Sequence, residues 1–346
     1  MEKIVVNLSG NSYDIHIGKG ILVNIDDFIE PNNEQNFLIS DENVYELYGH
    51  YFENLKGYEK IIVKPGEQSK SLETVSHILG QMLGLKGSRK SKVIAFGGGV
   101  VGDLGGFCSS IYMRGIEYIQ IPTTILAQVD SSIGGKTGVN FQNHKNTVGT
   151  FHQPSKVIVD IDLLQSLDRR QILNGLGEII KYGIIYDYEF FKYVKENIEG
   201  IGKSNSKVMS SVIKRCCEIK SEIVSKDEKE QNLRKILNFG HTFGHGLESI
   251  TNFLKYNHGE AVIIGMYYET LLAKRLGAID SEYFQEIMDF LNSLRVDLNV
   301  EDYPAANLID IMANDKKNHD GKISFILPTE RGKVEEYLLH KSQVKW

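Results

Sequence analysis

The stretch LRKILNFGHTFGHGLESI, residues 233–250, contains two histidines, an arginine and an asparagine at regular spacing. The apolar residues of this stretch follow the three-to-four spacing of an amphipathic helix, so we predict one helix across it. Arg234, Asn238, His241 and His245 lie at i, i+4, i+7 and i+11 and would share one face. The histidine pair HTFGH, at i and i+4, suggests a metal site.

Two further residues extend this pair into a possible metal centre. The segment NHGEAV places His258 just before the next predicted helix, and GLGEIIKYG places Glu178 on an otherwise apolar helix. A lone carboxylate is costly to bury there unless it is paired or bound to a metal. Two imidazoles and a carboxylate leave an open position on zinc, the catalytic arrangement. The alternatives are ordinary core or surface histidines and a surface salt bridge between Glu178 and Lys181.

A glycine-rich turn in SKVIAFGGGVVGDLGGF, residues 91–107, follows an apolar predicted strand. Glycines there let backbone amides approach a phosphate, and the next helix would direct its positive amino-terminal dipole at that anion. A ligand-free turn is the alternative, since the pattern lies mid-domain rather than at the start of a dinucleotide fold. Asp41, after the strand NFLIS, is a candidate for binding a ribose hydroxyl.

The segment IPTTILAQVDSSIGGKTGVN, residues 121–140, gathers hydroxyl groups, Asp130 and Lys136 around paired glycines. We interpret it as a polar loop that suits a polyhydroxylated anionic ligand. A solvated loop without a ligand is an equal alternative.

The elements that must position these groups fall into two classes. Strands are predicted over 3–8, 13–18, 36–40, 60–66, 91–96, 118–123 and 156–161, with a helix over 72–84. This alternation predicts an α/β domain with a largely parallel sheet. Helices are then predicted over 170–185, 207–224, 233–250 and 259–277, and one late strand over 321–328. We therefore predict an α/β domain at 1–160 and a helical domain at 161–346.

Composition narrows the class of protein. The chain has 346 residues, a formal net charge of −6 and three cysteines, two of which are sequence neighbours. The negative charge argues against a nucleic-acid partner, and no apolar run is long enough to span a membrane. The cysteines form no even-numbered disulfide framework. We expect a soluble cytoplasmic protein in which any anionic ligand is held by locally placed cations.

Considered together, the motifs resemble the 3-dehydroquinate synthase family of sugar phosphate cyclases. They run in order as GEQSK, GGGVVGDLGGF, YMRG, PTTILAQVDSSIGGKTGVN, HKNTVGTFHQP, GEIIKYG, LNFGHTFGH, HGEAV and NDKK. The resemblance implies a Rossmann-like NAD-binding α/β domain followed by an all-α domain. It also implies NAD, a zinc ion that cobalt can replace, and a homodimer.

The resemblance also assigns residues. It implies that zinc is bound by Glu178, His241 and His258, with His245 beside the metal as an aid to proton transfer. The implied catalytic residues are Lys136, Lys181, Lys220, Arg234, Asn238 and His245. The implied substrate contacts are Arg114, Asp130, Lys136, Lys145, Asn146, Lys220, Arg234, Asn238, Lys316 and Lys317. The implied NAD contacts are Asp41, Asn43, Glu67, Lys70, Gly98, Gly99, Val100, Asp103, Thr123, Thr124, Asp130, Lys136 and Lys145.

The reaction that the resemblance implies converts 3-deoxy-D-arabino-heptulosonate 7-phosphate to 3-dehydroquinate and phosphate. It proceeds by transient oxidation with NAD, β-elimination of phosphate, re-reduction and aldol closure. The alternatives are another sugar phosphate cyclase, such as a 2-deoxy-scyllo-inosose or 2-epi-5-epi-valiolone synthase, a metal-dependent polyol dehydrogenase, and a homologue without catalysis.

The glycines of the opening stretch need an explanation, because each costs about 1 kcal/mol relative to alanine inside a helix. We hypothesise that Gly240, Gly244 and Gly246 thin the helix so that metal, substrate and a neighbouring helix approach its backbone. The sequence departs from the family where Gly177 replaces a common alanine and where SLDRR replaces LPxR.

Overall fold

The computed structural model describes the chain except for residues 31, 143, 314–321 and 346, and it divides into two compact units. The sheet unit contains Met1–Leu167 and Ser204–Lys229, and the helical unit contains Asp168–Lys203 and Glu230–Trp346. These units differ from the predicted domains 1–160 and 161–346. The reason is helix α7 (Ser206–Lys226), whose apolar stripe packs on the first two strands of the sheet.

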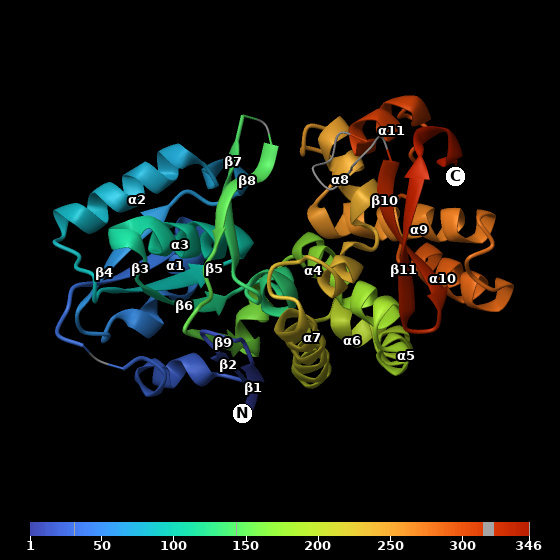
Figure 1. Ribbon diagram of the computed structural model, residues 1–346. Coiled ribbons are helices and arrows are strands. Elements are labelled where there is room, and N and C mark those ends of the chain that lie inside the picture. Colours follow the sequence, from blue (N-terminus) through green and yellow to red (C-terminus); the bar gives the residue numbers. More distant parts are fainter. Residues whose placement is uncertain (31, 143, 314–321, 346) are drawn as a thin grey trace. The chain divides into compact units, whose positions relative to one another are not determined.

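The sheet unit is built on seven strands in the order β1-β2-β9-β6-β5-β3-β4 (Figure 1). Strands β1 and β2 pair antiparallel, and all other neighbours are parallel, as predicted. The bounds are β1 (Glu2–Val6), β2 (Tyr13–Gly18), β3 (Asn36–Asp41), β4 (Tyr58–Val63), β5 (Lys92–Gly97), β6 (Glu117–Pro122) and β9 (Lys156–Asp160). All seven predicted strands of this domain are confirmed.

Each face of the sheet has its own core because neighbouring side chains of a strand point to opposite faces. On β3, Phe37 and Ile39 pack with the buried residues of α2 (Leu72–Gly84) and α3 (Gly99–Ile111). Leu38, between them, packs on the other face with the short helices η1 (Ile21–Asp27) and η2 (Gly49–Phe52). The central strands are therefore covered on both sides, as parallel strands require.

The strand order reverses at β3, the second strand from one edge of the sheet. After β3 the chain adds β4 on one side, and then returns to place β5 on the other side of β3. In open α/β sheets, ligands bind at the carboxyl ends of the strands beside such a switch point. The carboxyl ends of β3 and β5 are Asp41 and Gly97, which places the glycine-rich turn and the candidate aspartate at one edge.

The segment 121–140 is only partly a loop. After the π-helical turn η5 (Ala127–Ser131), Lys136–Phe141 forms strand β7 and pairs antiparallel with β8 (His144–Phe151). The Thr137 hydroxyl lies 3.0 Å from that of Thr150 on the facing strand. The loop prediction was wrong for this part, because it considered the polar residues and glycines of 121–140 without the partner strand, which begins at His144, beyond that segment.

The helical unit contains α4 (Arg169–Ile185), α5 (Tyr188–Glu196), α6 (Ile198–Gly202), η7 (Leu233–Asn238), α8 (His241–Ile250), α9 (His258–Arg275), α10 (Ser281–Ser293) and α11 (Ala305–Ala313). Side chains cap the first turn of several of them, such as Asp168 before α4 and Asp280 before α10. The hairpin of β10 (Lys322–Glu330) and β11 (Lys333–His340) completes the unit, so it is helical but not all-α (Figure 1). No helix among the described residues is long and apolar enough to cross a bilayer.

The stretch 233–250 is not one helix, contrary to its periodicity. Helix η7 ends at Asn238, Phe239 is extended, and Gly240 takes a left-handed conformation with φ of 78° before α8 begins. Glycine accepts this conformation at little cost, whereas other residues are strained there. The expected row of four polar side chains on one helical face is therefore split between η7 and α8.

Candidate active site

Three ligand-type side chains meet in the helical unit, each from a different helix. Glu178 lies on α4 and is fully buried, whereas His241 and His258 begin α8 and α9. Glu178 Oε1 is 3.4 Å from His241 Nε2 and 3.7 Å from His258 Nε2. The structure thus brings together the three residues predicted to bind zinc.

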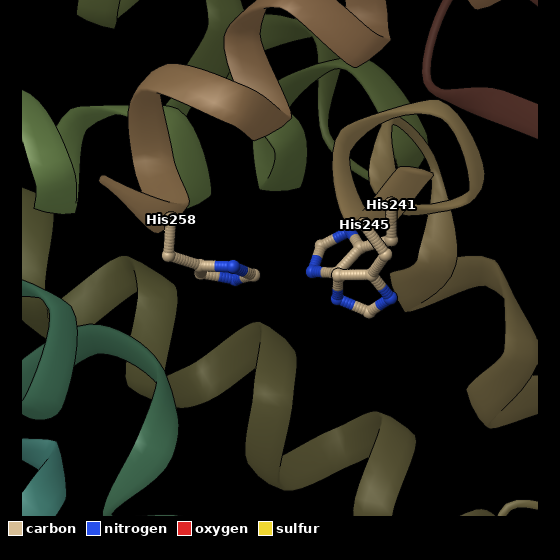
Figure 2. A group of neighbouring side chains, drawn as sticks. All are labelled: His241, His245 and His258. Carbon is tan, nitrogen blue, oxygen red and sulfur yellow. The ribbon is translucent and has the colours of Figure 1, made fainter. Parts of the chain in front are cut away.

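His245 lies beside this group. Figure 2 shows His241 and His245 next to one another on α8, with the ring of His258 facing them from α9. One nitrogen from each of the three rings lies within 4.8 Å of the others, so the imidazoles alone are a second possible ligand set. We favour the set with Glu178, because the Nε2 atoms of both His241 and His258 converge on its carboxylate.

The outer nitrogens of the two imidazoles each face an acceptor oxygen. His241 Nδ1 is 3.1 Å from the carbonyl oxygen of Phe239, and because a carbonyl only accepts, Nδ1 must donate. His258 Nδ1 lies 3.5 Å from Oε2 of the buried Glu248. Such contacts fix the tautomer that leaves an Nε2 lone pair for a metal.

The electrostatics of this site favour the neutral, metal-binding form of His241. Burial lowers the pKa of His241, and the nearby positive charge of Lys181 lowers it further, so the imidazole is neutral at neutral pH. Lys181 is itself buried and donates to Glu178 Oε2. A carboxylate and two imidazoles are a zinc donor set that leaves one coordination position open. These residues therefore fit a divalent cation.

Glycines set the spacing of the ligand-bearing helices. A Cβ added at Gly177, beside Glu178, would lie 2.7 Å from the carbonyl oxygen of Gly259, beside His258. A Cβ at Gly259 would lie only 1.9 Å from the carbonyl oxygen of Asn174 on α4. A Cβ at Gly265 of α9 would lie 1.9 Å from the carbonyl oxygen of Gly240, beside His241. Backbone therefore touches backbone next to each candidate ligand.

The glycines inside α8 have the same function in packing. A Cβ at Gly244 would lie 2.9 Å from the carbonyl oxygen of Ala261 on α9, and one at Gly246 would lie 2.9 Å from Met312 Cγ on α11. The part of the glycine hypothesis that concerns neighbouring helices is confirmed. Approach of metal or substrate to the α8 backbone stays a prediction.

Two predicted substrate contacts of the helical unit lie on η7. Arg234 is buried, with 2% of its surface exposed, and Asn238 donates to Glu230 Oε1 at 3.0 Å. A buried guanidinium is a strong, pre-oriented donor for a carboxylate or phosphate. Lys316 and Lys317 lie outside the described residues.

In the sheet unit, the predicted NAD contacts of three neighbouring strands share one edge. Asp41 ends β3 and caps α1 (Glu42–Tyr48) by accepting from the amide of Val44 at 3.0 Å. Burial raises the pKa of Asp41. The exposed Asn43 follows on α1. The other residues that the sheet brings to this edge are Gly98, Gly99 and Val100 after β5, and Thr123 and Thr124 after β6.

The space around the start of α3 fits a phosphate group. A Cβ added at Gly98 would lie 3.1 Å from Thr124 Cγ2, and one added at Gly99 would lie 3.2 Å from Ser131 Oγ. Side chains at these two positions would therefore fill the space, which we call the cradle. The hydroxyl oxygens of Thr123 and Ser131 are buried without a hydrogen-bond partner in the part of the chain that the structure describes. Ser131 is not among the NAD contacts that the resemblance implies, and only the fold brings it to the glycine turn.

Other predicted NAD contacts bind one another. Lys70 pairs with Asp103 of α3 and donates to Asn146 Oδ1 at 2.5 Å. Burial alone would lower the pKa of Lys70, but Asp103 and Glu67 raise it above its ordinary value. Glu67 accepts from Asn140 at 2.8 Å. These contacts link α3 to the β7–β8 hairpin.

The remaining predicted substrate contacts of the sheet unit are mostly cations. Lys220 of α7 is buried and lies 2.9 Å from Asp130 Oδ1, and it also donates to the carbonyl oxygen of Asp130 at 2.6 Å. Lys136 is exposed at the start of β7, and Lys145 is half-buried on β8. Arg114 is exposed in the turn after α3, with a positive φ of 72°.

Comparison with known proteins identifies the family. The model of the 3-dehydroquinate synthase N-terminal domain matches residues 60–174, and that of the C-terminal domain matches residues 175–318. The chain belongs to the 3-dehydroquinate synthase family. The 3-dehydroquinate synthase of Alkaliphilus metalliredigens is 53% identical over 342 residues, covering 98% of this chain and 96% of that protein.

Solved structures of 3-dehydroquinate synthase-like cyclases share the fold. A 2-deoxy-scyllo-inosose synthase complexed with carbaglucose-6-phosphate, NAD+ and Co2+ has a TM-score of 0.89 and 24% identity, covering 99% of this chain and 98% of that one. The 2-epi-5-epi-valiolone synthase ValA of Streptomyces hygroscopicus subsp. jinggangensis, with NAD+ and Zn2+ bound, has a TM-score of 0.88 and 27% identity. The match covers 99% of this chain and 97% of ValA.

Proposed function

We propose that this protein converts 3-deoxy-D-arabino-heptulosonate 7-phosphate to 3-dehydroquinate and phosphate, as a phosphate-eliminating lyase. The observation that carries the proposal is the convergence of Glu178, His241 and His258 in a chain of this family. The outer nitrogens of both imidazoles face acceptor oxygens, as in metal sites of known proteins.

The cofactors that we propose are NAD and a divalent cation, zinc or cobalt in its place. NAD+ supplies a reversible hydride acceptor, and the cation polarises hydroxyl groups of the substrate. NAD+ with Zn2+ or Co2+ in the two related cyclases supports both assignments. In this chain, the donor set around Glu178 fits the cation, and the cradle at Gly98 and Gly99 fits a pyrophosphate.

The residues of the sheet unit would bind and orient the cofactor. Backbone amides at the start of α3 point along the helix axis, where the dipole favours the negative charge of phosphate. Asp41 would accept from a ribose hydroxyl while it keeps its bond to the amide of Val44. The Lys70–Asp103 pair would hold α3 in place rather than contact the cofactor first.

The remaining residues would hold the substrate and move protons. The substrate carries a carboxylate and a phosphate, which lysine and arginine can bind locally in a chain of net charge −6. In the helical unit, Arg234 and Lys181 are buried, which supports a role in binding these anionic groups. A buried cation is an effective hydrogen-bond donor to an anion. His245, beside His241, would hold or transfer a proton at its ring nitrogen.

Another sugar phosphate cyclase is the main alternative. The two related cyclases share the fold at 24% and 27% identity, whereas the 3-dehydroquinate synthase of Alkaliphilus metalliredigens is 53% identical. The higher identity favours the dehydroquinate reaction. We also propose a homodimer and a reducing cytoplasmic setting, the latter supported by three buried cysteines that form no disulfide.

A coupled assay tests the proposed function. Zinc-loaded protein is incubated with NAD+ and 3-deoxy-D-arabino-heptulosonate 7-phosphate while phosphate release and NADH absorbance are followed together. We expect stoichiometric phosphate and 3-dehydroquinate without net NADH, because the hydride is returned in each turnover. Accumulation of NADH would instead indicate a dehydrogenase. Absence of phosphate would reject this substrate, and other sugar phosphates would then be assayed.

A further inference from the structure

Helices α8 and α9 each carry a buried glutamate that contacts the first residues of the other helix. Glu248 lies on α8 and Glu269 on α9, and only 2% and 1% of their surfaces are exposed. Glu248 Oε2 is 3.5 Å from His258 Nδ1, at the start of α9. Glu269 accepts from the amides of Gly240 at 2.7 Å and Phe243 at 3.0 Å, on either side of His241.

We propose that Glu248 and Glu269 are positioning residues of the metal centre. Each of the two helices that carry a candidate ligand histidine supplies a carboxylate that holds the histidine-bearing end of the other helix. This inference rests on the proposed metal site of Glu178, His241 and His258. Neither glutamate was among the residues predicted from the sequence, because each lies in an apolar segment without a recognisable motif.

Glu248 acts on the ring of His258. The Glu248 carboxylate, 3.5 Å from Nδ1, favours a proton on that nitrogen, which would orient the imidazole and increase the electron density at Nε2, 3.7 Å from Glu178 Oε1. Loss of such an outer partner typically weakens metal binding by about 10–100-fold. Glutamine at this position keeps the size and an acceptor oxygen but removes the charge.

Glu269 acts on the backbone that carries His241. The first amides of a helix have no partner within the helix, and a carboxylate there also interacts favourably with the helix dipole. Its two oxygens each take one amide, which fixes the left-handed Gly240 directly before His241. Since His241 Nδ1 also bonds to the carbonyl of Phe239, the ring and the turn before it are held together.

A merely structural role would lower stability without changing the metal site, so metal binding is the deciding measurement. Apo forms of the wild type, E248Q, E269Q and E269D are titrated with Co²⁺, and the visible absorption spectrum and Kd are recorded. E286Q is the control: Glu286 is a half-buried carboxylate of the same unit that bonds to Tyr188 and Lys195. Thermal unfolding of each apo form gives its stability.

We expect E248Q to raise the Kd for Co²⁺ by about 10–100-fold while its turnover at saturating Co²⁺ recovers. We expect E269Q or E269D, whichever folds, to alter the spectrum of bound Co²⁺, because the amides of Gly240 and Phe243, on either side of His241, lose the carboxylate that holds them. E286Q should bind as the wild type does. Wild-type affinity and spectrum in E248Q and the Glu269 variants would overturn the positioning role alone. Failure of the wild type to bind Co²⁺ would reject the metal centre, and with it this inference.

Discussion

Replacing Gly259 by alanine should separate the contribution of helix packing to metal binding from its contribution to stability. Gly259 follows His258 at the start of α9, and its amide donates to Asn174 Oδ1 at 2.7 Å. An added Cβ would lie 1.9 Å from the carbonyl oxygen of Asn174 and 2.5 Å from its carbonyl carbon. Backbone atoms cannot rotate away as a flexible side chain can, so α9 must move relative to α4.

The size of the movement follows from ordinary contact distances. Non-bonded atoms are most favourably separated by about 3.5 Å, so the contact must open by roughly 1.5 Å. Metal–ligand distances tolerate about 0.2 Å. His258 would therefore leave its place relative to Glu178, and metal affinity should fall by more than the roughly 10–100-fold cost of an outer partner. Overpacking typically costs about 1–3 kcal/mol, which corresponds to a fall in Tm of roughly 2–10 °C.

The assay is Co²⁺ titration of the apo G259A protein beside calorimetry of the same sample. G80A is the matched control, since Gly80 lies inside α2 and an added Cβ there has no atom within 4 Å. That variant should gain about 0.5–1 kcal/mol from helix propensity and bind Co²⁺ as the wild type does. If folded G259A bound Co²⁺ with wild-type affinity, the close contact of α4 and α9 would not determine the ligand distances.

Three other variants or treatments test further parts of the structure. K181M breaks the buried pair with Glu178, so the apo protein should lose about 3–5 kcal/mol of unfolding free energy, and added Zn²⁺ should restore part of it. An equal loss of stability with Zn²⁺ and with a chelator would contradict this. D41N keeps the cap of α1 but loses a charged acceptor, so Tm should stay unchanged. Titration calorimetry should show that the Kd for NAD+ rises about tenfold. An unchanged Kd would exclude a contact between Asp41 and the cofactor. Burial raises the pKa of Cys108 and Cys217 to about 12, so a thiol reagent should label neither before unfolding; rapid labelling of native protein would show that the thiols are accessible.

The sequence was a reliable guide wherever one element is specified by its own residues. The strands of the parallel sheet were predicted because runs such as those around Phe37 and Ile94 are apolar, β-branched and bounded by turn residues. Asp41 and Gly98 could be placed at strand ends for the same reason. The types of the metal donors were also visible, since a carboxylate in an apolar helix and nearby imidazoles stand out from their surroundings.

The tertiary structure decided what depends on partners distant in the sequence. The periodicity around Gly240 predicts an unbroken helix, but the carbonyl oxygen of this residue packs against Gly265 and its amide binds Glu269, both on α9. The packing of α7 on β1 and β2 also rests on contacts that no local pattern encodes. The sequence alone determined which residues could bind a metal and a phosphate. Only the fold determined their distances, because helix spacing is set where backbone meets backbone, as at Gly177 and Gly259.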